Sequence, residues 1–233
     1  MDVAVAASTP VFLPRSSRWI VGVDLGQSVD WTAIAVVEHI KGVIDTGTVM
    51  ERHCGLSTGK QTPAVRVDVR HLERVPLNTS YPAIVAYVKE LLARPPLCGD
   101  GKLKPAELVI DQTGVGAAVG DLFEAGGMKP IRVSITAGSE VTYAKRAWHV
   151  AKTVLVSTVD AMLHTGVLRF AAELTEAGAM REELLDFRRH LGTAGRATYA
   201  ARTGKHDDLV LSVAVACWWA SRPPPSLPGM GCW

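Results

Sequence analysis

The sequence lacks the features that mark secreted, membrane-spanning or disulfide-stabilised proteins. It has four cysteines in 233 residues, and no two of them form a C-x-x-C pair: Cys54, Cys98, Cys217 and Cys232. This scatter argues against a zinc knuckle or a disulfide framework, and it predicts reduced thiols. The longest strongly apolar run, Leu209 to Ala220, is shorter than the roughly 20 residues that span a bilayer. We therefore expect a buried helix there and no membrane association.

Neither sign of charge dominates. Lys and Arg number 25 and Asp and Glu number 23, which gives a formal net charge of +2. A nucleic-acid partner would then require the basic residues to gather on one face. The length suits a single domain, which we place at residues 18–221. Residues 1–17 carry no Lys or Arg ahead of their apolar stretch, so we interpret them as a flexible leader and not a secretory signal. Residues 222–233 are a proline-rich tail.

The first third of the domain has the pattern of antiparallel strands. Three β-rich runs are separated by a polar turn and by Lys41-Gly42: Trp19–Val23, Trp31–Glu38 and Val43–Met50. Connections this short let neighbouring strands pair as hairpins. We expect Glu51–Pro63 to be a loop. Val65–Val75 alternates apolar with charged residues, which is typical of a strand with one wet face.

The rest of the chain alternates strands with helices. Ser80 is placed to cap a helix over Tyr81–Ala93, and Pro95 and Pro96 end it. Further strands are expected at Glu107–Ile110, Ile131–Ile135 and Val167–Phe170, and further helices through Phe123, over Ala147–His164, over Glu173–His190 and from His206. Such alternation implies parallel strands joined by right-handed crossovers. Three antiparallel strands followed by parallel βα units make an α/β mixed sheet flanked by helices, in the order of a ribonuclease H-like domain.

Acidic residues stand at three element ends. Asp24 ends the first strand, Asp111 follows the Leu108–Ile110 run, and Asp207 and Asp208 open the apolar last helix. A carboxylate beside a buried strand costs several kcal/mol unless it caps a helix or binds a cation. Converging carboxylates repel one another, and Mg²⁺ or Mn²⁺, which prefer oxygen ligands, relieves that repulsion.

Each acidic residue also has an ordinary structural explanation. Asp24 could make an Asx turn, Asp111 could cap the following helix, and the pair at 207 and 208 could complement a helix dipole. Their joint placement, at two strand ends and one helix start, is harder to explain in that way. The sequence therefore favours a metal site.

Three segments carry a more specific resemblance: Gly22–Gly26 (GVDLG), Val109–Gly116 (VIDQTGVG) and Thr203–Leu211 (TGKHDDLVL). Together they resemble the nuclease domain of bacteriophage large terminase subunits, over about Trp19 to Ala220. The resemblance implies a ribonuclease H-like fold, two divalent metal ions (Mg²⁺ or Mn²⁺) and cleavage of concatemeric double-stranded viral DNA during genome packaging. It further implies a phage- or prophage-encoded protein acting in the bacterial cytoplasm, with a terminase ATPase, a small terminase subunit or a portal as partner.

The resemblance does not extend to the ATPase motor that large terminases carry. The nearest phosphate-loop candidate, Gly55–Gln61, has one residue too few between its glycines, and Gln61 stands where Ser or Thr should hold Mg²⁺. We interpret it as a loop. The chain is then an excised domain, half of a split terminase or a stand-alone relative.

The implied mechanism is phosphodiester hydrolysis with two ions about 3.5–4 Å apart. Asp24 would bridge the ions, Asp111 and Asp208 would each hold one, and Asp207 would assist. Which member of the Asp207–Asp208 pair is the direct ligand stays open, because consecutive helix residues point about 100° apart. Possible DNA phosphate contacts are Lys205, His206, Lys145 and Arg146, with Arg66, Arg70 and Arg74 as further candidates.

Two other functions share parts of this pattern. A Holliday-junction resolvase would have the same fold and carboxylates but would require a dimer. Asp24–Ser28 also resembles the phosphate-binding turn of actin-like and sugar-kinase ATPases, which need two such domains. A non-catalytic DNA-binding module is a further alternative if the metal site is incomplete.

Overall fold

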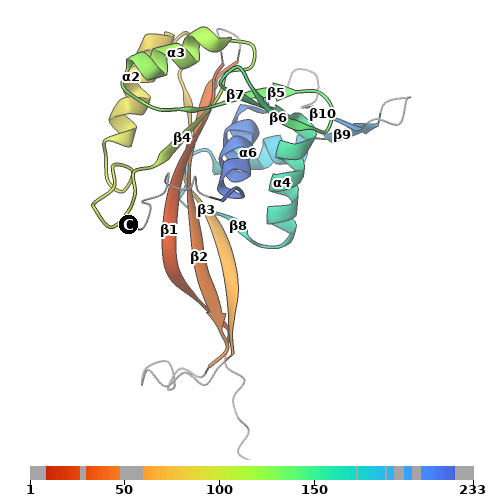
Figure 1. The fold of residues 1–233 in the computed structure, drawn as a ribbon. Helices are drawn as coiled ribbons and strands as arrows, with labels where there is room; N and C mark the ends of the chain where they lie inside the picture. Colours follow the sequence, from red (N-terminus) through yellow and green to blue (C-terminus); the bar gives the residue numbers. More distant parts are fainter. Residues whose placement is uncertain are drawn as a thin grey trace, which may run out of the picture.

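The computed structural model describes residues 9–26, 30–47, 60–171, 173–186, 188–191, 197–200 and 206–223. In these residues an eight-stranded mixed sheet has helices on both faces (Figure 1). Its strand order is β6-β7-β5-β4-β1-β2-β3-β8. The α/β class and the predicted sequence of antiparallel strands followed by parallel units are confirmed.

Three long antiparallel strands form the first half of the sheet. They are β1 (Val11–Asp24), β2 (Thr32–Asp45) and β3 (Gln61–Val75), with β2 between the other two. The strand predicted to start at Val43 is wrong, because β2 runs without interruption through Lys41 and Gly42. Gly42 serves a close approach and not a turn: a Cβ there would stand 2.3 Å from the Leu13 carbonyl oxygen.

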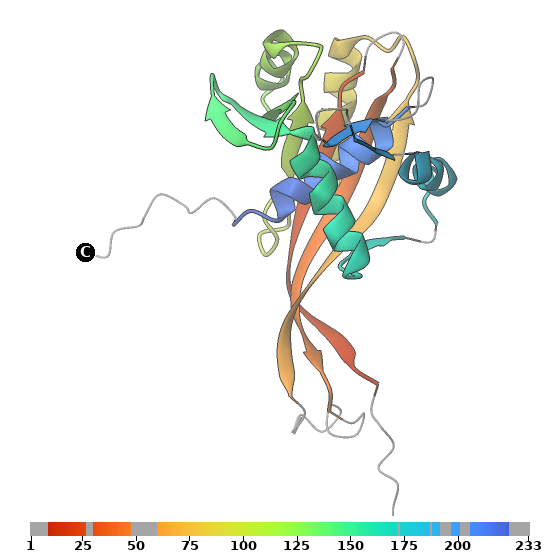
Figure 2. The same ribbon diagram turned by 90° about the vertical axis from the view of Figure 1, so that its right-hand side faces the viewer.

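The sheet also reaches further in both directions than expected. β1 begins at Val11, where it pairs with Asp45, so residues 11–17 belong to a strand and not to a leader. Likewise Gln61–Pro63, predicted to be loop, pair with Val43–Asp45 at the start of β3. Pairing with β2 places both segments in the sheet, although neither shows a long alternation of apolar and polar residues in the sequence. Figure 2 shows this part of β1, β2 and β3 as an arm that extends beyond the helices.

From Tyr81 to β5, the parallel half follows the prediction closely. Helix α2 (Tyr81–Leu92) begins after Ser80, whose hydroxyl accepts a hydrogen bond from the Ala83 amide. β4 (Glu107–Asp111) pairs in parallel with β1, and β5 (Ile131–Thr136) pairs in parallel with β4. Helix α3 (Ala117–Ala125) connects β4 to β5.

The predicted helix from Ala147 begins five residues late. Ala147–Ala151 form β7, which pairs with β5 in parallel and with β6 (Val141–Ala144) in a hairpin; α4 then covers Lys152–His164. The apolar residues of this stretch suit either period, and the open edge of β5 decides for the strand. β8 (Leu168–Phe170) is confirmed. The predicted Glu173–His190 helix is shorter, because α5 spans Ala177–Asp186 and β9 (Arg188–Leu191) pairs with β10 (Ala197–Ala200).

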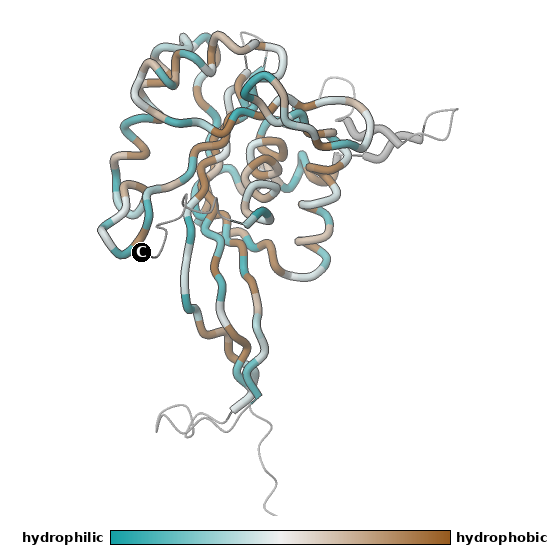
Figure 3. The backbone as a smooth tube through the Cα atoms, in the orientation of Figure 1, coloured by the Kyte–Doolittle hydropathy of each residue, from teal (hydrophilic) through white to brown (hydrophobic). Residues whose placement is uncertain are grey.

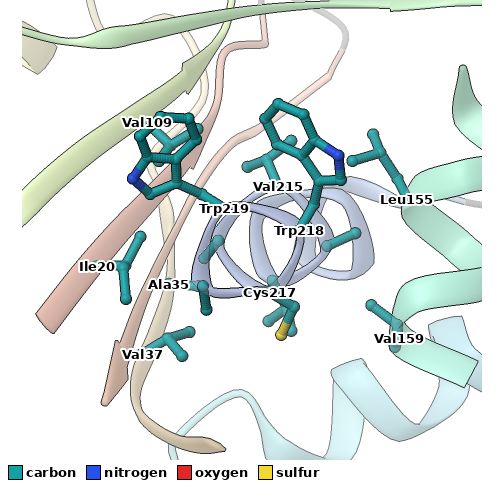
Figure 4. Close-up of a cluster of buried hydrophobic side chains, with 14 of the residues drawn as sticks. Ile20, Ala35, Val37, Val109, Leu155, Val159, Val215, Cys217, Trp218 and Trp219 are labelled. Carbon is teal, nitrogen blue, oxygen red and sulfur yellow. The ribbon is translucent and has the colours of Figure 1, made fainter. Parts of the chain in front are cut away.

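The last helix, α6 (Asp208–Ala220), is the centre of the larger core. All thirteen of its residues are buried, as the apolar run predicted. It packs on β1 and β2 with α4 beside it, and Trp218 and Trp219 point toward Leu155 and Val109 (Figure 4). A second core lies between the other face of the sheet and helices α2 and α3. Figure 3 shows hydrophobic residues gathered where β1 and β2 pass between these layers.

Two of the four cysteines fall within the described residues, and both Cys98 and Cys217 are free thiols. Cys54 and Cys232 lie outside the described residues. No helix in the described residues has the length and apolar character needed to cross a membrane.

Candidate active site

One pocket collects all four predicted carboxylates. Asp24 and Asp111 end adjacent parallel strands and are register partners, so their backbones lie about 4.8 Å apart. Asp207 and Asp208 reach the same place from the start of α6. The pocket has a volume of about 430 Å³, and its other polar lining residues are Asp30, Thr113, Lys152 and His206. The structure thus brings together the four aspartates that the sequence predicted to converge.

Burial and mutual repulsion perturb the carboxyl groups. The pKa of Asp24 is raised well above its ordinary value, first by burial and then by the charges of Asp111, Asp208 and Asp207. Burial also raises the pKa of Asp111. For Asp208, burial raises the pKa to about 6, against the opposing effect of His206 and Arg74. Buried carboxylates this close together must either be protonated or be neutralised by cations. The cluster therefore favours cation binding.

Thr113 fixes the orientation of Asp111. Its amide and its hydroxyl both donate to Asp111 Oδ1, at 2.9 and 2.5 Å. The same hydroxyl accepts a hydrogen bond from the Ile135 amide at 2.6 Å, which links it to β5. Thr113, which is itself anchored to β5, therefore holds the Asp111 carboxylate in a fixed orientation.

The adjacent pair at the start of α6 is divided by its surroundings. The Lys152 ammonium lies 2.6 Å from Asp207 Oδ2, so Asp207 is ion-paired. Asp208 is only 5% exposed, and its Oδ2 has no hydrogen-bond donor among the described residues. A buried carboxylate oxygen without a donor is the feature expected of a ligand atom.

Asp208 also belongs to a second grouping that the sequence prediction missed. One potential ligand atom each from Asp30, His206 and Asp208 lie within 4.8 Å of one another. His206 Nδ1 is 3.7 Å from Asp30 Oδ1 and 3.8 Å from Asp208 Oδ2. Asp30 stands in a polar turn with no periodic pattern around it. Its only sequence signal is its position six residues after Asp24.

Glu183 of α5, which is distant in the sequence, fixes the start of α6 by a direct hydrogen bond. Glu183 Oε2 accepts a hydrogen bond of 3.0 Å from the Val210 amide, while Asp207 makes no side-chain cap. Arg74 pairs with Glu183 and lies over the Trp31 ring, 4.9 Å from its centroid; that ring packs edge-on against His206. Burial raises the pKa of Glu183 to about 7. No sequence signal points to this residue, because it lies in a short charged helix.

The predicted DNA contacts have mixed outcomes. His206 lines the pocket, but Lys145 and Arg146 do not: they form the turn between β6 and β7, where Arg146 pairs with Glu124. Arg66, Arg70 and Arg74 all pair with carboxylates of the domain.

Several predictions cannot be compared with the structure. Lys205, most of the Gly55–Gln61 segment, and Gln27 and Ser28 of the alternative phosphate turn lie outside the described residues.

No family model matches the sequence, and neither does any curated protein. The fold, in contrast, resembles solved nuclease domains. The large terminase nuclease of thermophilic phage G20c is 20% identical, with a TM-score of 0.53 over 86% of this chain and 81% of that chain. Its structure with bound magnesium gives 21% identity and a TM-score of 0.56 over 91% and 84%. The large terminase nuclease domain of Thermus phage P74-26 gives 19% and 0.54 over 86% and 78%.

At identities this low, the similarity establishes the fold alone. The chain has the ribonuclease H-like mixed sheet of terminase nuclease domains, as the strand order predicted.

Proposed function

We propose that this chain is a metal-dependent DNA endonuclease of the large terminase type, acting on concatemeric viral DNA during genome packaging. The observation that carries the proposal is the convergence of Asp24, Asp111, Asp207 and Asp208 in one pocket. Without bound metal, burial and mutual repulsion disfavour the ionised form of these carboxyl groups. A Holliday-junction resolvase would share these carboxylates, so the DNA substrate that is cleaved distinguishes the two functions.

The residues of the pocket fit divalent cations. Asp208 supplies a buried oxygen without a donor among the described residues, and Asp24 and Asp111 supply two more carboxylates beside it. Oxygen donors suit Mg²⁺ and Mn²⁺, and a single imidazole such as His206 is compatible with Mn²⁺. We assign Asp24, Asp111 and Asp208 as ligands of two ions, with Asp30 and His206 at the rim. When bound, such ions activate a water molecule and stabilise the charge on the leaving 3′ oxygen.

The remaining polar residues position these ligands. Thr113 orients the Asp111 carboxylate, and Glu183 fixes the helix start that carries Asp208. Lys152 compensates the charge of Asp207, so that Asp207 assists from beside the ligands. The positively charged Lys152 ammonium also lies in the pocket wall, where it can contact a DNA phosphate.

The G20c large terminase nuclease, which has been solved with bound magnesium, supports the choice of metal. By analogy, residues 18–221 form the nuclease domain, extended here to Val11 by β1. The same analogy supports a terminase ATPase, a small terminase subunit or a portal as partner, and the cytoplasm of a bacterial host as the place of action. The motor would then reside on another chain or segment.

Plasmid cleavage tests the proposal. Supercoiled plasmid incubated with the protein and Mn²⁺ or Mg²⁺ should be nicked and linearised, and EDTA should prevent this. Asp24→Ala should abolish cleavage, while Asp160→Asn, at an exposed position of α4, should retain it. Unchanged cleavage by Asp24→Ala would refute the assignment. Cleavage confined to four-way junctions would favour a resolvase, and ATP turnover without cleavage would favour the kinase-like alternative.

A further inference from the structure

A second groove lies away from the carboxylate pocket, beside the middle of β1 and the C-terminal end of α6. We call it the edge groove; its walls are Ser16–Trp19 of β1, Lys41 of β2, Lys102 and Lys104 before β4, and Ala220–Pro223 after α6. It encloses about 1010 Å³. Arg18 precedes Asp24 by six residues, or about 20 Å of strand. The length of α6 gives about the same separation, so the edge groove is not an extension of the pocket.

The β1 strand has an open edge in this groove. β4 pairs with β1 only from the Ile20–Glu107 position onward. Before that point β1 pairs with β2, and no other described strand lies on its outer side (Figure 1). Further upstream, the bulge between Pro14 and Ser16 shifts the register of β1 on β2. A short stretch, Ser16–Trp19, thus offers backbone groups to an added strand.

The groove carries uncompensated positive charge. Lys41, Lys102 and Lys104 are exposed, and no carboxylate within the described residues lies at ion-pairing distance from them. The acid in the lining, Glu107, is already occupied by Arg18 and by the Trp219 indole. The pKa of the buried His39 is lowered, by burial first and then by the charges of Arg18 and Lys41. The positive potential therefore reaches into the groove.

The floor between these cations is apolar. It includes Trp19, Val65, Met162 and Ala220, and the Trp19 indole nitrogen is buried with no acceptor among the described residues. An apolar floor within a polar, charged rim is the anatomy of a protein interface. A nucleic-acid contact would instead present cations on an open surface to phosphates.

We propose that the edge groove binds an extended acidic segment of a partner protein, which adds as a strand beside Ser16–Trp19. Main-chain hydrogen bonds to β1 would give affinity, and Lys41, Lys102 and Lys104 would select for acidic side chains. An apolar side chain of the segment would cover Met162 and Ala220. This inference stands independently of the proposed nuclease function, because it uses no residue of the carboxylate pocket.

Peptide binding in EDTA tests the selection for acidic side chains. The probes are fluorescein-labelled seven-residue peptides in which Asp or Glu alternates with Val, Leu or Phe, measured by fluorescence polarisation. Members of this set should bind, and their Asn/Gln counterparts should not. Lys102→Glu/Lys104→Glu should weaken binding by about tenfold or more. The matched double Lys89→Glu/Lys129→Glu, at exposed positions elsewhere, should leave it within about twofold.

N-methylation tests strand addition. Methylating alternate amides of the best peptide in the two possible phases should abolish binding in one phase and preserve it in the other, because a strand faces its neighbour with every second residue. Equal effects of the two phases would refute strand addition. Absence of binding, equal binding by neutral peptides, or equal loss in both lysine doubles would overturn the proposal. So would an oligothymidylate that binds with the same dependence on Lys102 and Lys104.

Discussion

Replacing Asp208 by Asn should stabilise the metal-free protein at neutral pH. Burial raises the pKa of this carboxyl from 3.8 to about 6. Each pH unit corresponds to about 1.4 kcal/mol, so the ionised group costs about 3 kcal/mol before screening by water. Halving this for the open mouth of the pocket leaves about 1.5 kcal/mol. For a domain of this size that is a rise in Tm of about 3–6 °C.

The pH dependence has a defined sign. Because the folded pKa lies above the unfolded one, the penalty is absent below pH 3.8 and complete above about pH 6. Metal-free wild-type protein should therefore lose stability between these values relative to Asp208→Asn. Binding of Mn²⁺ reverses the order, since only the wild type keeps all its ligands and gains the full binding free energy.

Differential scanning fluorimetry measures both effects, in EDTA and in Mn²⁺, at pH 4 and pH 7.5. Asp160→Asn serves as the control, since it removes an exposed charge from α4. If Asp208→Asn melts at or below the wild-type temperature in EDTA at pH 7.5, the reasoning is wrong. A stabilisation of equal size at pH 4 would also contradict it, because the cause could then not be ionisation.

Three further substitutions test the packing and the positioning of the pocket. Gly22→Ala places a Cβ 2.2 Å from a backbone oxygen of α6 and should cost about 2–3 kcal/mol in urea unfolding, whereas Gly178→Ala, with open space around it, should cost nothing. Thr113→Val removes a donor to Asp111 and should weaken Mn²⁺ binding by about 10-fold or more in calorimetry, with Thr113→Ser restoring it. Glu183→Ala deprives an α6 amide of its acceptor and should lower the free energy of unfolding by about 1–3 kcal/mol; no change would show that the amide has another partner.

The sequence predicted best where an element is decided by its own residues. Asp24 and Asp111 end strands whose apolar character is strong, and α6 is apolar after Asp208 apart from Ser212. The positions of these three aspartates could therefore be predicted directly from the sequence. Ser80 capped its helix as expected. In these places local preference and tertiary packing agree.

The predictions failed where a distant partner decides. Ala147–Ala151 suit a helix as well as a strand, and pairing with β5 and β6 settles the choice. Glycine at position 42 is typical of a turn, yet here its lack of a side chain allows the close approach of β1. Asp30 and Glu183 were missed for a related reason: each acquires its place from a residue far along the chain, His206 in one case and Val210 in the other. A single sequence carries no record of such meetings.

The burial of α6 has a consequence for how the domain folds. This helix is the last described element of the chain, and it packs against β1, the first. Loop closure over nearly the whole chain must therefore precede completion of the larger core. Asp24 and Asp208 are brought together in that same late step, so their repulsion raises the free energy only at the end of folding. On the ribosome, the chain would stay without its central core until α6 has emerged, and a chain interrupted before Asp208 would leave the apolar faces of β1 and β2 uncovered.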